Sequence, residues 1–82
     1  MGQQVSGDYR PQEVIVKFKD DVPAAEIERI AGSENLGIIK VLPRRVYLFR
    51  ITGSSSVTDT IEALKRRKEV EYAEPNYIER VK

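Results

Sequence analysis

The sequence predicts an α+β domain of ferredoxin-like βαββαβ order, in which a four-stranded antiparallel sheet carries two helices on one face. Runs with the alternation of a strand are separated by runs with the period of about 3.6 residues that marks a helix. The 82 residues suffice for one core only. We therefore expect a flexible N-terminal arm (residues 1–12), a folded domain (13–76) and an extended C-terminal tail (77–82).

The first half of the chain predicts a strand followed by a helix. Residues 14–19 alternate apolar side chains with mostly polar ones, as a half-buried first strand does. Ala24, Ile27, Ile30 and Ala31 recur at intervals of three or four residues, as the apolar side of an amphipathic helix does, so a helix is expected over residues 24–31. Pro23 suits the first turn of this helix, where its missing N–H costs nothing, and Gly32 is expected to end it.

The second half predicts a hairpin, a helix and a last strand. Residues 36–42 and 46–51 are rich in β-forming residues and form the hairpin. Ser56 and Asp59 have the spacing of a capping box, so a helix is expected over about residues 57–67. The basic run 65–68 lies at the negative end of that helix, where we expect it to stay in solvent. Residues 70–73 complete the sheet before Pro75, which cannot donate to a strand ladder.

The composition excludes the commonest kinds of active site. The chain has no histidine and no cysteine, which removes Ser-His and Cys-His pairs, the usual zinc sites and disulfides. A net charge of +1 gives no overall field toward nucleic acid or an anionic membrane. We therefore expect a non-catalytic domain without metal or cofactor, and neither a nucleic acid nor a membrane as its partner.

The sheet face turned away from the helices is expected to be more apolar than a surface that only meets water. Alternation places this outward set there: Ile15, Lys17, Ile38, Lys40, Leu42, Val46, Leu48, Arg50, Glu71 and Ala73. The helix-packed set is Val14, Val16, Phe18, Ile39, Val41, Tyr47, Phe49, Ile51, Val70 and Tyr72. Apolar patches rimmed by charge commonly mark docking surfaces, so Ile15, Val46 and Leu48 are expected to contact a partner. A register slipped by one residue exchanges the two faces.

Two segments at opposite ends of this pattern carry a family resemblance. Residues 10–18 read RPQEVIVKF and residues 70–77 read VEYAEPNY. Together they resemble the propeptides of subtilisin-like serine proteases over about residues 10–82, and the related standalone proteinase inhibitors. The resemblance implies an inhibitor and folding template (intramolecular chaperone) of such a protease, secreted with it or as part of its zymogen, and monomeric when free.

The resemblance also implies how the protease is contacted. The open sheet face packs on two surface helices of the enzyme, and Glu74 and Asn76 stand where the family places caps for the N-termini of those helices. Family members with an acid at the second place carry a charge that Asn76 lacks, so its cap is expected to be weaker. The alternative is that residues 74–76 form only a strand-ending turn.

The C-terminal tail is expected to lie in the substrate cleft like a cleaved product. Its residues are Tyr77, Ile78, Glu79, Arg80, Val81 and Lys82. Lys82 then precedes the scissile bond, and the upstream residues pair with the cleft by β-augmentation. Glu79 departs from the apolar residue usual in the fourth subsite, so Lys82 is either the natural processing point or an arbitrary boundary. The alternative is a disordered basic tail.

Other functions of the same topology stay as alternatives. RNA-recognition domains place aromatic residues on a central strand, as Tyr47 and Phe49 are placed here, but their glycine-spaced motif is absent and both aromatics fall in the helix-packed set. A regulatory ligand-binding domain requires a pocket or a dimer interface. An acylphosphatase-like enzyme requires a phosphate loop that the sequence lacks.

Overall fold

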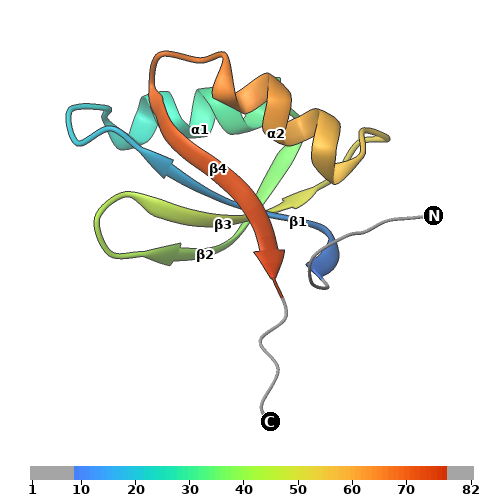
Figure 1. The fold of residues 1–82 in the computed structure, drawn as a ribbon. Coiled ribbons are helices and arrows are strands. Elements are labelled where there is room, and N and C mark those ends of the chain that lie inside the picture. Colours follow the sequence, from blue (N-terminus) through green and yellow to red (C-terminus); the bar gives the residue numbers. More distant parts are fainter. Residues whose placement is uncertain (1–8, 78–82) are drawn as a thin grey trace, which may run out of the picture.

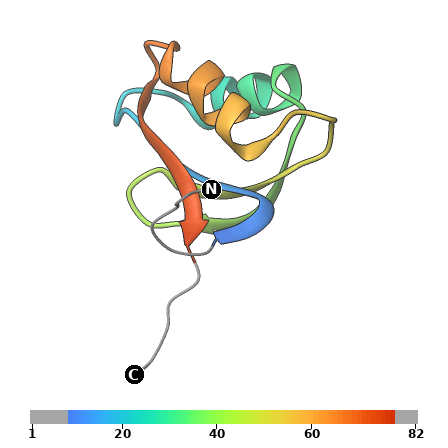
Figure 2. The same cartoon turned by 45° about the vertical axis from the view of Figure 1, so that its right-hand side comes forward.

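The computed structural model describes residues 9–77, and its elements follow the predicted βαββαβ order (Figure 1). They are β1 (Tyr9–Phe18), α1 (Ala24–Ser33), β2 (Leu36–Leu42), β3 (Val46–Ile51), α2 (Val57–Lys65) and β4 (Val70–Tyr77). All strand pairs are antiparallel, and the sheet order is β2-β3-β1-β4. Both helices lie on the same face of the sheet, which leaves the other face open (Figures 1 and 2). The ferredoxin-like prediction is confirmed.

The core lies between the sheet and the helices. Its fully buried large side chains are Phe18, Phe49, Ile27, Ile30, Leu64, Val14 and Val16. The ring of Phe18 meets those of Tyr47 and Phe49 edge-on, at centroid distances of 5.7 and 6.3 Å. Since Tyr47 and Phe49 are buried on the helix side, these two aromatic residues do not form the exposed platform that an RNA-recognition domain uses. Among residues 9–77, no helix is both long and apolar enough to cross a membrane.

β1 begins at Tyr9, earlier than the expected start at Val14. Gln12 has a φ of 62°, and the register with β4 shifts between Tyr9 and Val14. Beyond this irregularity, Tyr9 pairs with Tyr77 at the end of β4. A bulge breaks the two-residue alternation, which is why the sequence pattern does not reveal this part of the strand.

The two helices end at different residues from those expected. α1 continues through Gly32 to Ser33, and the left-handed residue that follows it is Asn35, with a φ of 58°. Asparagine is, after glycine, among the residues that best tolerate this conformation. α2 ends at Lys65, two residues before the expected end. Its start is as predicted, since Ser56 Oγ accepts a hydrogen bond from the Asp59 N–H at 3.0 Å.

The basic run 65–68 at the end of α2 does not stay entirely in solvent, contrary to our expectation. Arg67 Nε donates to Glu34 Oε2 at 2.8 Å, and Arg67 Nη2 donates to Ser33 Oγ at 3.2 Å. The side chains of Arg67 and Glu34 are 25% and 20% exposed. The ion pair joins the C-terminal ends of the two helices, and the sequence gives no sign that these ends are neighbours.

An irregularity in β4 reverses the sheet faces predicted for Tyr72 and Ala73. Lys17 pairs with Tyr72 but Phe18 pairs with Val70, so Glu71 is an extra residue on the β4 side. Val70 and Ala73 are consequently both buried, while Tyr72 is 41% exposed. The prediction that Ala73 faces outward and Tyr72 faces the helices was therefore wrong.

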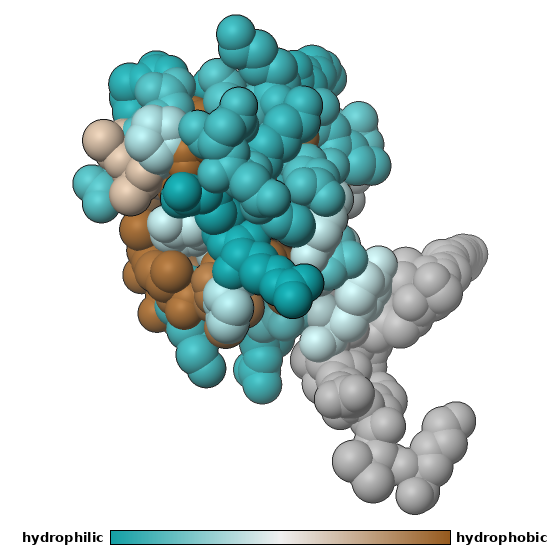
Figure 3. All heavy atoms as spheres, turned by 90° about the vertical axis from the view of Figure 1, so that its left-hand side faces the viewer, coloured by the Kyte–Doolittle hydropathy of each residue, from teal (hydrophilic) through white to brown (hydrophobic). Residues whose placement is uncertain are grey.

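An irregularity in β2 changes the faces of the opposite edge strand. The register shifts between Ile38 and Lys40, so Ile38 pairs with Phe49 on the helix side, against the prediction that it faces outward. Val41 pairs with Tyr47 on the helix side, as predicted. Ile38, Ile39 and Val41 nevertheless remain exposed. The prediction that Ile39 and Val41 pack under the helices was therefore wrong. Figure 3 shows hydrophobic side chains gathered below the polar surface of the helix layer.

Candidate functional site

The open face is a grid of cross-strand rows, because residues paired across a sheet point to the same side. The Tyr72 row consists of Tyr72, Lys17, Val46 and Leu42. The Ile15 row consists of Glu74, Ile15, Leu48 and Lys40. The Glu13 row consists of Asn76, Glu13, Arg50 and Gly37. In each row the order runs from β4 through β1 and β3 to β2.

The Ile15 row brings together residues that the sequence analysis selected for separate reasons. Ile15 lies between Leu48 of β3 and Glu74 of β4, and it pairs directly with both. Ile15, Leu48 and the neighbouring Val46 are half-buried, whereas Glu74 is exposed. An apolar centre therefore has a carboxylate at its β4 edge.

The Glu13 row holds the second predicted cap residue. Asn76 Nδ2 donates to Glu13 Oε1 at 2.9 Å, and Arg50 Nη2 lies 4.0 Å from Glu13 Oε2. The Glu13 side chain is only 15% exposed. Glu13 was not predicted from the sequence, because its place beside Asn76 depends on the pairing of the first and last strands, which no local pattern specifies.

The Tyr72 row contains a lysine whose charge is held at the end of the sheet. Lys17 Nζ donates to the Arg44 carbonyl at 3.0 Å, and it lies 3.5 Å from Asp20 Oδ1 and 3.7 Å from Glu71 Oε1. The Lys17 side chain is 17% exposed. Tyr72, like Glu13, was not predicted to lie on the open face, since the irregularity at Glu71 reverses the alternation of β4.

A family model for the fervidolysin N-terminal prodomain matches residues 1–76. The chain belongs to the fervidolysin N-terminal prodomain family. It is therefore a propeptide of the subtilisin-like protease type, and the resemblance seen in the sequence is confirmed. Searches of curated proteins and of solved structures return no match. The matched range includes all three rows of the open face.

The C-terminal part of the prodomain is described as far as Tyr77. Tyr77 is the last residue of β4, pairs with Tyr9 and is 53% exposed. The other tail residues of the sequence analysis, Ile78, Glu79, Arg80, Val81 and Lys82, lie outside the described residues.

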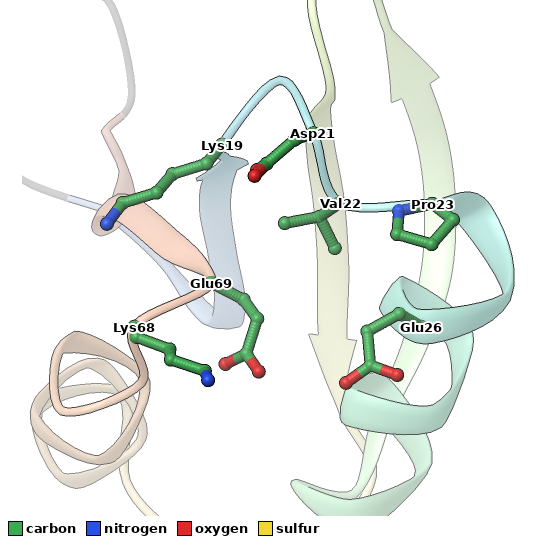
Figure 4. A pocket seen from close by; sticks show the side chains of 7 residues that line it. All are labelled: Lys19, Asp21, Val22, Pro23, Glu26, Lys68 and Glu69. Atoms are coloured by element: carbon green, nitrogen blue, oxygen red, sulfur yellow. The ribbon is translucent and has the colours of Figure 1, made fainter.

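A pocket of about 410 Å³ lies away from the open face, where the segment between β1 and α1 faces the segment between α2 and β4 (Figure 4). It is lined by Lys19, Asp21, Val22, Pro23, Glu26, Lys68 and Glu69. A hydrogen bond from Arg29 holds the pKa of the Glu26 carboxyl below its ordinary value. Ligand pockets are predominantly apolar, whereas this one is lined mostly by charged side chains of both signs. Residues 9–77 contain no group of three side chains suited to hold a metal ion.

Proposed function

We propose that this prodomain binds the catalytic domain of a subtilisin-like serine protease through its open face, inhibits it and serves as its folding template. The observation that carries the proposal is the Ile15 row, in which Ile15 and Leu48 meet Glu74 at the β4 edge of an uncovered sheet. Burying an apolar side chain contributes about 1.5–3 kcal/mol when it goes from full exposure to full burial. The half-buried pair supplies part of that range when a partner covers it.

Glu74 and Asn76 are suited to act as caps for helices of the protease. They lie two residues apart on the edge strand β4, and their side chains share the open face. A helix N-terminus presents backbone N–H groups without partners and the positive end of the helix dipole. Glu74 offers it a carboxylate, and Asn76 offers the amide oxygen, because its amide nitrogen already donates to Glu13.

The tail continues the same surface into the active-site cleft of the protease. Residues 78–82 follow directly after β4, so a cap interaction at Asn76 fixes where they begin. An extended peptide in a protease cleft pairs with the edge strands that border it. In this arrangement Tyr77, Ile78, Glu79, Arg80 and Val81 occupy upstream positions, and Lys82 precedes the scissile bond.

The role requires no catalysis by the prodomain itself. A bound domain that fills the cleft inhibits by occupancy, which agrees with a chain that has neither histidine nor cysteine. In this proposal the domain is made as part of a secreted precursor, is a monomer when free and uses no metal or cofactor. As a folding template, it lowers the free energy of protease intermediates that have already formed the docking helices.

The direct test is inhibition in trans. The 82-residue chain is titrated into mature fervidolysin and into a second subtilisin, and hydrolysis of a peptide substrate is followed over time. The proposal predicts progressive slowing with at least one of these proteases, without hydrolysis by the chain alone. Unchanged rates with both proteases at tens of micromolar chain would contradict it.

A further inference from the structure

The irregularity at Glu71 places an aromatic side chain on the open face. Regular alternation along β4 puts Tyr72 on the same side as Val70, facing the helices. With Glu71 as an extra residue, Val70 and Ala73 both face the core, and Tyr72 lies across from Lys17 on the open side. The fold thus buries a small residue and exposes a tyrosine.

Lys17 makes the Tyr72 row of the open face less polar than the presence of a lysine suggests. Its ammonium is held by the Arg44 carbonyl, Asp20 and Glu71, all at the end of the sheet where β1 stops. A lysine whose charge is held in this way presents its methylene stem to its neighbours. The stem lies between Tyr72 on one side and Val46 on the other, so the Tyr72 row continues as an apolar strip to Leu42.

Tyr72 differs in position from two other exposed large hydrophobic residues of the described chain, Ile38 and Val41. Ile38 and Val41 pair with Phe49 and Tyr47 and therefore lie on the helix side. Tyr72 is 41% exposed and adjoins the Ile15 row, which holds Glu74 two residues further along β4. Tyrosine is enriched at protein interfaces, since it offers a large and rigid contact area at a low cost in conformational entropy.

We infer that Tyr72 is a protease-contact residue, and that the Tyr72 row is a second apolar strip of the docking surface beside the Ile15 row. This inference rests on the proposed function. The occupant is the catalytic domain itself, because Tyr72 shares face and strand with Glu74. A partner that covers Ile15, Leu48 and Glu74 reaches the adjoining row as well.

The test uses a protease that the unchanged chain inhibits, either mature fervidolysin or the second subtilisin. Inhibition constants of Tyr72→Ala and Tyr72→Phe are compared with that of the unchanged chain. We expect Tyr72→Ala to weaken inhibition roughly tenfold, as truncation of an aromatic interface anchor does. Tyr72→Phe keeps the ring and stays within about twofold. Val41→Ala, a truncation at an exposed apolar residue on the helix side, serves as the matched control and also stays within about twofold.

Thermal melts of each variant separate contact from folding. Tyr72→Thr, which keeps a high β-strand propensity, is measured beside Tyr72→Ala. Weakened inhibition with an unchanged Tm in either variant supports the inference, and losses of Tm and inhibition together in both variants overturn it. If the unchanged chain inhibits and Tyr72→Ala inhibits equally well, only this inference is wrong. If the unchanged chain does not inhibit either protease, the proposed function is wrong as well.

Discussion

Asn76 and Glu13 are 63 residues apart in the chain, yet the Asn76 side-chain amide donates to Glu13 Oε1 at 2.9 Å. The bond joins the edge strand β4 to β1 on the open face, close to the point where the tail begins. It holds Asn76 in one orientation. It also places a carboxylate, that of Glu13, next to the side chain of Asn76.

This arrangement makes an acid at position 76 unfavourable here. Asn76→Asp replaces a donor by a carboxylate beside the half-buried Glu13, so we expect the free energy of unfolding to fall by about 1–2 kcal/mol at neutral pH. Denaturant unfolding of the variant measures the loss. The double variant Asn76→Asp with Glu13→Gln is expected to recover most of it, because the amide introduced by the second substitution donates to the carboxylate introduced by the first. Unchanged stability of the single variant would show that the Asn76–Glu13 bond contributes nothing.

Glu74 is expected to affect binding but not folding. Its side chain is exposed on the edge strand. Glu74→Ala should therefore leave Tm unchanged and weaken protease binding by about 0.5–2 kcal/mol, the range for a lost helix cap. The matched control is Glu62→Ala, which removes an exposed carboxylate from α2 on the helix layer. A loss of Tm without a loss of inhibition would assign Glu74 to an internal turn.

The tail is expected to contribute affinity and no stability. Deletion of residues 78–82 retains Tyr77 and its pairing with Tyr9, so the melting curve should be unchanged. The contacts proposed in the cleft are lost, and inhibition should weaken by well over tenfold, which corresponds to more than about 1.4 kcal/mol. Inhibition constants of the truncated and full chains measure the difference. Equal inhibition by the two chains would exclude a product-like tail.

Arg67 is expected to stabilise the domain, whereas its neighbour Arg66 is not. Arg67→Gln removes a part-buried ion pair with Glu34 and a hydrogen bond to Ser33, for an expected loss of about 0.5–1 kcal/mol. Arg66→Gln, at an exposed position one residue earlier, is the control and should change the free energy of unfolding by less than about 0.5 kcal/mol. Equal effects of the two substitutions on chemical unfolding would contradict this account.

Local patterns predicted the elements because strands and helices each leave a periodic pattern among neighbouring residues. The alternation of Val14, Val16 and Phe18 predicted the core face of β1, and the spacing of Ser56 and Asp59 predicted the start of α2. A periodic pattern depends only on residues a few positions apart, so it indicates the same element whichever strands are paired.

What the sequence did not predict depends on strand register. An extra residue beside Phe18 reversed Tyr72 and Ala73, and the irregularity around Gln12 hid the first residues of β1. Glu13 became visible as a partner of Asn76 only once the first and last strands were paired. Alternation assigns residues to the two faces of a sheet only while the two-residue period is uninterrupted, and a bulge reverses the assignment for the residues beyond it.

Docking of the open face on the protease is best examined by comparing Leu48→Lys with Val41→Lys. Leu48 is half-buried on the open face, whereas Val41 is 59% exposed and lies on the helix side. The ammonium that Leu48→Lys introduces faces Lys40 across the strands, which costs the free domain up to about 1 kcal/mol, so melts are recorded for both variants. If the open face docks on the protease, Leu48→Lys raises the inhibition constant more than about tenfold while Val41→Lys leaves it unchanged. Equal inhibition by the two folded variants, or a loss confined to Val41→Lys, would contradict it.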